Sequence, residues 1–278
     1  MALQRASDAV RPWLWLSVAA AILAILGSVT SLAVHGIYAG LTSAFLPQAI
    51  AQDVANLAIA SPALLVTVAL ALRGSLRAYL VWLGVLAFTV YNYVIYTFSV
   101  PFGPLFLLWV AVLGMCLFSL IGGVVAVDHV AVQQSFTNRS AVVVVAWSLI
   151  VIAALFCLLW LSEDVPALLA GAVPRSVRDM ALPTNPVHVL DLAFFLPAVV
   201  ISAVQLLRRR PLGFTAAPAF LVFLILTGAP ILLTPVVQRT LGQEASWGVV
   251  VPIGTLTVVL VGVLSWLLAS VRQADGAP

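Results

Sequence analysis

The chain has 278 residues, of which 64% are hydrophobic and only 8% are charged, and its mean hydropathy is +1.20. A soluble domain carries about 25% charged residues, so this composition excludes an ordinary soluble protein and predicts a multi-pass membrane protein. The 12 basic residues are all arginines and leave a net charge of only +3, which gives no indication of nucleic-acid binding. Membrane lipids are the partners that we expect.

Eight stretches are long and apolar enough to cross a bilayer, which requires about 20 mainly apolar residues. In chain order they are residues 13–34, 55–72, 76–99, 104–127, 141–161, 187–207, 214–237 and 247–271. The sequence therefore predicts an all-α, polytopic transmembrane helix bundle of about eight spans, with residues 1–278 forming a single domain. The count becomes seven if the short second stretch lies partly in the membrane interface. No internal repeat is evident.

The arginines predict the orientation of the bundle, because short cytoplasmic loops collect positive charge. With the N-terminus inside, eight spans place all but three of the 12 arginines on the cytoplasmic side. The exceptions are Arg175, Arg178 and Arg239. We therefore expect both the N-terminus and the C-terminus to be cytoplasmic, with the first span kept as an uncleaved anchor.

Polar residues gather where the second span begins. If a helix starts near Pro47, then Gln48, Gln52 and Asn56 share one face at four-residue spacing, and Asp53 lies beside that face. A helix end wetted by interfacial water explains this pattern as well as a binding site does. On the second reading, Gln52, Asp53 and Asn56 are predicted ligand-binding residues.

The third span carries a second polar group in its outer half, where Asn92 and Tyr96 are four residues apart and can point the same way. Tyrosines at this depth are ordinary interfacial anchors. The amide of Asn92 lies about 10 Å inside the outer boundary, where it needs water or a partner on another helix. Asn92 and Tyr96 are therefore added to the predicted ligand-binding residues.

The sixth span opens with Asn185, which suits an N-cap, and then Pro186, His188 and Asp191. His188 and Asp191 are three residues apart on one side of the helix. One reading is a structural ion pair; the other is an acid/base pair in which Asp191 orients His188 for proton transfer or ligand binding. Glu163 and Asp164, which end the fifth span on the outer side, are expected to be surface charges in a solvated loop.

The predicted polar residues all fall in the outer third of the bundle, whereas ion-coupled transporters usually hold ionisable groups near the membrane midplane. This asymmetry predicts a shallow pocket, open to the outer leaflet, that binds or processes a lipid-like or amphipathic small molecule. Two alternatives stay open. The protein could be a transporter whose helices are kinked at Pro62, Pro197, Pro230 or Pro235, the seventh span being the most irregular, or an accessory subunit of a membrane complex.

No catalytic motif names a reaction, no cofactor is predicted, and the oligomeric state stays open. His35, Asp53, His188 and Asp191 offer nitrogen and oxygen ligands, but they come from different spans without short-range ligand spacing, so no metal site is assigned.

Short sequence patterns connect the chain with a family. They are Gln52-Asp53, the RGSLR turn at residues 73–77, the YNY run at 91–93 followed by Tyr96, and the RRRPLG turn at 208–213. Through these patterns the chain resembles a family of uncharacterised bacterial and archaeal multi-pass membrane proteins. The resemblance implies a shared fold in the plasma membrane of a bacterium or archaeon, and it implies no particular activity.

Overall fold

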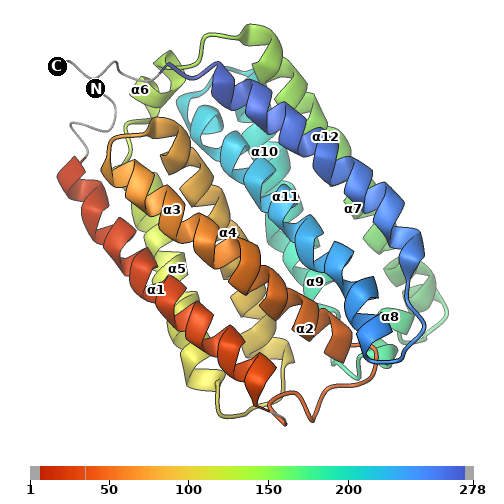
Figure 1. The fold of residues 1–278 in the computed structure, drawn as a ribbon. Helices are drawn as coiled ribbons and strands as arrows, with labels where there is room; N and C mark the ends of the chain where they lie inside the picture. Colours follow the sequence, from red (N-terminus) through yellow and green to blue (C-terminus); the bar gives the residue numbers. More distant parts are fainter. Residues whose placement is uncertain (1–6, 35, 273–278) are drawn as a thin grey trace.

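The computed structural model describes residues 7–34 and 36–272, and eight of its helical segments are long and apolar enough to cross a membrane. This confirms the predicted all-α polytopic bundle (Figure 1). Within the described residues no β-strand forms, and one isolated bridge joins Phe136 to Val271. The spans are α1 (Ser7–Ala33), α2 to α3 (Leu46–Leu72), α4 (Leu76–Ser99), α5 (Phe106–Ala126), α7 (Arg139–Leu169), α9 to α10 (Pro186–Leu207), α11 (Pro211–Thr240) and α12 (Val250–Ala269).

Two of the eight spans contain a π-helix. The second consists of α2 (Leu46–Ala55), the π-helix η1 (Asn56–Ala60) and α3 (Ser61–Leu72), and the sixth consists of α9 (Pro186–Leu190), the π-helix η2 (Asp191–Phe195) and α10 (Leu196–Leu207). Two short helices lie outside the spans, α6 (His129–Gln134) and α8 (Arg175–Asp179), and the 3₁₀-helix η3 (Trp247–Val249) begins the eighth span ahead of α12.

The helix irregularities occur in the second and sixth spans, whereas the sequence favoured the seventh. The prediction for the seventh span is wrong, because α11 stays α-helical from Pro211 to Thr240 although it contains Pro218, Pro230 and Pro235. The π-helices instead precede Pro62 and Pro197, each of which lies two residues after the end of a π-helix. A π-helix inserts one residue per turn and is frequent at functional sites.

Two helices also extend beyond their predicted ends. The second span begins at Leu46 rather than at residue 55, with Pro47 in its first turn as expected for a residue that lacks a backbone N–H. Helix α7 continues to Leu169 rather than ending at residue 161. Consequently Glu163 and Asp164 lie on a helix that faces the bundle, and the prediction that they are hydrated loop charges is wrong.

The order of helices repeats within the bundle, although no repeat was evident in the sequence. The second and sixth spans match at a constant offset of 135 residues: η1 and η2 start at 56 and 191, the 12-residue helices α3 and α10 start at 61 and 196, and α4 and α11 start at 76 and 211. The turns match too, since positive backbone φ angles occur at Gly74 (88°) and at Arg209 (54°).

Helix packing follows the same repeat. The first half consists of the four spans from α1 to α5, and the second half of the four spans from α7 to α12. In the first half α1 packs against α3 and α5, and α4 packs against both α3 and α5. In the second half α7 packs against α10 and α12, and α11 packs against both α10 and α12. Each half contributes four spans and therefore crosses the membrane in the same direction, as in parallel-repeat transporters. The two halves share one hydrophobic core.

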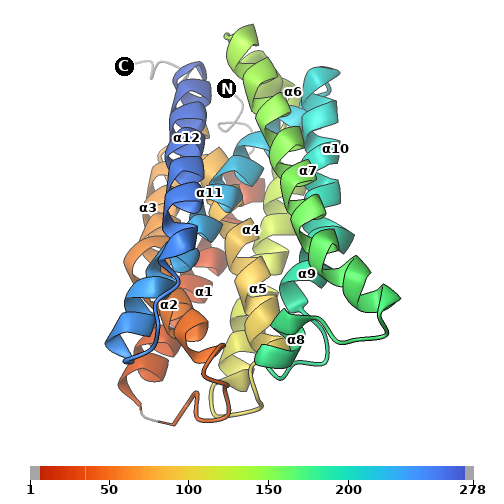
Figure 2. The same ribbon diagram turned by 90° about the vertical axis from the view of Figure 1, so that its right-hand side faces the viewer.

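The halves meet along α4 and α11, which lie at the centre of the bundle (Figures 1 and 2). In α4, 83% of the most apolar window is buried, against 6% in α12, which lies at the periphery. Gly84 permits the close approach of α4 to α11, because a Cβ atom there would lie 2.4 Å from Cβ of Val222 and 2.5 Å from the carbonyl oxygen of Ala219. Small residues at such crossings are typical of membrane helices.

Helix α1 begins and α12 ends at the same end of the bundle, shown at the top of Figure 1. We call this the inner end and the opposite one the outer end, following the orientation that the arginines predict. The polar residues singled out above lie toward the outer end. Figure 2 shows the outer part of α7 diverging from α12.

Candidate functional site between the two halves

Asp53 lies at the centre of a closed cluster of hydroxyl groups and is only 2% exposed. Its Oδ1 accepts hydrogen bonds from Ser28 Oγ and Tyr96 Oη, both at 2.9 Å, and its Oδ2 accepts from Ser31 Oγ and Tyr38 Oη, both at 2.5 Å. A carboxylate offers about four acceptor positions, so these four donors satisfy it. Asp53 therefore has no acceptor capacity left for a ligand.

The cluster also affects Tyr38, which lies in the connection between α1 and α2. Burial raises the pKa of the Tyr38 phenol above its ordinary value, and the neighbouring Asp53 raises it further. Tyr38 therefore stays a hydrogen-bond donor at physiological pH. Ser28, Ser31 and Tyr38 were missed from the sequence, although the three-residue spacing of Ser28 and Ser31 in an apolar span marks a shared polar face.

His188 is the centre of a second polar cluster and is 4% exposed. Its Nδ1 lies 3.0 Å from Oδ1 of Asp164 and 3.1 Å from Oδ2, while its Nε2 lies 3.9 Å from Oε2 of Glu163. The ring stacks on Trp160 with centroids 4.5 Å apart. The carboxylate that orients His188 is thus Asp164 and not Asp191, which corrects the pairing inferred from the sequence. Asp164 and Glu163 therefore flank the imidazole from two sides and fix its orientation.

Asp191 starts the π-helix η2 and is 9% exposed. Its Oδ2 accepts a hydrogen bond of 2.8 Å from Trp160 Nε1. The phenol of Tyr91 is a second neighbour of this carboxylate. Trp160 therefore connects His188 and Asp191, stacking on one and donating to the other. Sequence reasoning missed Trp160 because a tryptophan near the end of a span is usually an interfacial anchor.

The two clusters occupy equivalent positions in the repeat. At the offset of 135 residues, Asp53 corresponds to His188. Asn56 corresponds to Asp191, and these two residues are the first residues of η1 and η2. Ser28 corresponds to Glu163, and each contacts its partner from the first helix of its half. The first cluster is closed by hydroxyl groups, whereas the second combines one imidazole with three carboxylates.

A cavity of about 400 Å³ lies between the two halves at the outer end. Helices α2 and α4 contribute to one side of it, and α7, α9 and α11 to the other. Gln52, Asn92, Tyr96, His188 and Asp191 line it, so five of the seven predicted site residues come together there. Asp53 and Asn56 are not among the lining residues and lie behind them. Further polar or aromatic lining residues are Phe45, Gln48, Tyr91, Phe156, Trp160 and Glu163.

Asn92 is the most informative of the lining residues. It is 5% exposed, and its Nδ2 is buried without a hydrogen-bond partner. A buried amide without a partner costs about 1–3 kcal/mol, so its presence in the cavity wall requires a reason. The Nδ2 of Asn56 also lacks a partner, although Oδ1 of Asn56 accepts a 3.0 Å hydrogen bond from Gln52, which confirms that these two residues share a face.

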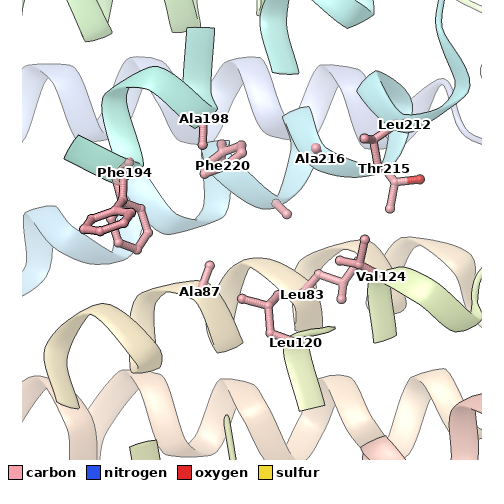
Figure 3. A pocket seen from close by; sticks show the side chains of 12 residues that line it. Leu83, Ala87, Leu120, Val124, Phe194, Ala198, Leu212, Thr215, Ala216 and Phe220 are labelled. Atoms are coloured by element: carbon pink, nitrogen blue, oxygen red, sulfur yellow. The ribbon is translucent and has the colours of Figure 1, made fainter. Parts of the chain in front are cut away.

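A second cavity, of about 310 Å³, lies closer to the inner end and is almost entirely apolar. Side chains of α4 and α5, among them Leu83, Ala87 and Leu120, face those of η2, α10 and α11 across it (Figure 3). Phe195 lines this inner cavity and Tyr91 lines the outer one.

Three aromatic rings in mutual contact lie between the two cavities. Phe195 stacks on Phe223 with centroids 4.6 Å apart, and Tyr91 meets both rings edge to face at 4.8 and 5.3 Å. The π-helix η2 connects the two cavities along the chain, because Asp191 at its start lines the outer cavity and Phe195 at its end lines the inner one.

Fold and site together define a multi-pass membrane protein made of two four-span halves with a polar, aromatic cavity between them. Comparisons of the chain with protein-family models, with curated proteins and with solved structures find no match. The family resemblance noted from the sequence therefore stays a prediction. His35 lies outside the described residues; among residues 7–34 and 36–272, no three His, Cys, Asp or Glu side chains group in a way that could hold a metal ion.

Proposed function

We propose that the outer cavity binds an amphipathic small molecule that enters from the outer leaflet. The observation that carries this proposal is the buried, unpartnered amide of Asn92 in the wall of a cavity of about 400 Å³. Ligand sites typically enclose about 300–1,000 Å³ and combine mainly apolar walls with a few convergent polar groups. The cavity meets both criteria, with Gln52, His188 and Asp191 as further polar groups.

The amphipathic character of the ligand follows from the distribution of lining residues. Polar groups such as Gln52 on α2, Asn92 on α4 and His188 on α9 share the wall with apolar side chains such as Phe156 on α7 and Ile231 on α11. His188 and Asp191 remain candidate acid and base groups for a ligand held there.

Filling the cavity tests the proposal. Thr234 lines the cavity on α11, so Thr234→Trp places an indole in the ligand's space, whereas Val258→Trp adds the same side chain to an exposed position on α12 that is 72% accessible. The three proteins would be purified into lipid nanodiscs and their bound small molecules identified by mass spectrometry. We expect an amphipathic molecule at near one copy per chain in the wild type and in Val258→Trp, reduced at least about ten-fold in Thr234→Trp.

An identical profile of copurified molecules in all three proteins would contradict the proposal. A melting temperature of Thr234→Trp within a few degrees of the wild type checks that the loss reflects the filled cavity rather than unfolding.

Transport is a second candidate function, favoured by the inner cavity and the aromatic rings that separate it from the outer one. Parallel-repeat transporters bind substrate at the interface of their halves and expose it alternately to the two sides. Here both cavities lie at that interface, and Tyr91, Phe195 and Phe223 close the path between them.

If the rings are the barrier, Phe223→Ala connects the two cavities. We expect this variant to speed the movement of a short-chain fluorescent amphiphile between the leaflets of proteoliposomes several-fold over the wild type, because the substituted residue leaves a gap on the order of a benzene ring. Phe220→Ala, which enlarges the inner cavity without touching the ring stack, is the matched control. Equal rates in both variants and in protein-free liposomes would rule out transport along this path.

A further inference from the structure

We infer that the ligand of the outer cavity carries a positive charge, as an alkylammonium or other organic cation does. This inference rests on the proposed function, since it names the chemistry of the molecule that the cavity takes. Three features carry it: the sign of the charge around the cavity, the unused acceptor capacity of one carboxylate, and the aromatic rings in the wall.

All the fixed charge at the cavity is negative. Glu163 and Asp191 line it, Asp164 contacts His188 behind it, and no arginine is among the lining residues. The arginines nearest in sequence, Arg175 and Arg178, pair with Asp179 on α8 and have side chains that are 84% and 68% exposed. His188 balances at most one of the three carboxylates when it is protonated. A buried carboxylate without a cation is costly, so a cationic ligand would complete the site.

The two buried aspartates of the spans differ in how many hydrogen bonds their carboxylates accept. Asp53 accepts four hydroxyl hydrogen bonds and faces no cavity. Asp191 accepts one close hydrogen bond, from Trp160, and lines the cavity together with Tyr91. The equivalence of the two clusters in the repeat makes this contrast informative, because Asp53 does not line the outer cavity whereas His188 and Asp191 do.

The wall supplies the second element of cation recognition. Phe45, Tyr91, Tyr96, Phe156 and Trp160 all line the cavity. An ammonium group near the face of an aromatic ring gains about 0.5–2 kcal/mol, most where water is excluded. The unpartnered Nδ2 of Asn92 is a hydrogen-bond donor in the same wall, so it suits an acceptor atom elsewhere on the ligand and not the ammonium group itself. The carboxylate and the rings together select an ammonium head with an apolar substituent over a neutral or anionic amphiphile of equal size.

A matched series of soluble amphiphiles tests the inference: hexylammonium, 1-hexanol and hexanoate, which share one alkyl chain and differ in charge. Each would be titrated by calorimetry into the full-length protein in nanodiscs of uncharged lipid, with empty nanodiscs as reference. We expect hexylammonium to bind at least about ten-fold more tightly than 1-hexanol, and hexanoate to bind most weakly.

Two variants locate the preference. Asp191→Asn should reduce the preference for hexylammonium over 1-hexanol to about two-fold or less, while Glu244→Gln, at an exposed outer loop position, should leave it unchanged. If Asp191→Asn fails to fold, Glu163→Gln on α7 provides the same comparison with a smaller expected loss.

The outcomes separate this inference from the proposed function. Equal affinity for hexylammonium and 1-hexanol, with both lost in Thr234→Trp, would overturn the cation and leave the amphiphile site standing. Tighter binding of hexanoate would overturn the cation as well. Binding of none of the three, or binding that Thr234→Trp does not alter, would overturn both proposals.

Discussion

Replacing Asp53 with leucine should destabilise the protein by at least about 3 kcal/mol, the largest effect that we expect from any single substitution. The carboxylate is the shared acceptor for four hydroxyl groups from α1, the following loop and α4. Leucine fills the same space but leaves these donors to find other partners in an apolar interior, where each unsatisfied group costs about 1–3 kcal/mol. Reversible unfolding of the purified protein in mixed micelles with increasing denaturing detergent measures the difference.

Smaller changes in the same cluster calibrate this result. Tyr38→Phe removes one donor of four and should cost about 1 kcal/mol, because one lone pair of Asp53 then lacks a partner. Asp53→Asn keeps one acceptor oxygen and should fall between the two. A leucine variant as stable as the wild type would show that the hydroxyl cluster does not hold the first half together. Any folded Asp53→Asn protein should still bind ligand, since Asp53 does not line the outer cavity.

Gly84→Ala should have the second largest effect, because it acts where the two halves meet. The added Cβ would lie 2.4 Å from a side-chain carbon of Val222 and 2.5 Å from the carbonyl oxygen of Ala219, and the backbone of α11 must move to relieve the second contact. Overpacking of this kind costs about 1–3 kcal/mol. The displacement also shifts Asn92 on α4 relative to Thr227 on α11, both of which line the outer cavity, so ligand binding should weaken together with stability.

The matched control is Gly114→Ala on α5, where no atom lies within 4 Å of the added Cβ. Because alanine is the better helix former by about 1 kcal/mol, this variant should be as stable as the wild type or slightly more stable. The same unfolding measurement, run beside calorimetric titration of hexylammonium, compares the two. A Gly84→Ala protein with unchanged stability and unchanged affinity would contradict the close crossing of α4 and α11.

Much of the fold was predictable because the solvent of the spans is hydrocarbon. Charge is so costly there that runs of apolar residues separated by arginines, glycines and prolines mark the helices, and all eight spans were found in this way. The ends were less well predicted. Helix α7 continues past Glu163 and Asp164 because these residues contact His188 and Ser176 rather than bulk water, and such contacts are not visible in a hydropathy pattern.

The candidate site was predicted in part, for a related reason. Asn92, His188 and Asp191 were found because polar groups at membrane depth are rare. Their partners were missed because contacts such as that between Trp160 and Asp191, or that between Ser28 and Asp53, join different spans. The repeat was missed because it consists mainly of matching backbone conformation, namely the paired π-helices and turns. In the side chains it is reduced to short matches such as Pro62-Ala63 and Pro197-Ala198.

Photochemical labelling tests the central claim, a ligand cavity between the two halves, most directly. A short alkyl amphiphile carrying a diazirine, prepared with an ammonium head and with a hydroxyl head, would be irradiated with the protein in nanodiscs and the labelled residues mapped by mass spectrometry. We predict labels from at least one of the two probes on α4, α7, α9 and α11 at residues lining the outer cavity, such as Tyr91, Trp160 and Thr234, and their loss in Thr234→Trp. Labels confined to lipid-facing residues such as Val258, with either head group, would contradict the account.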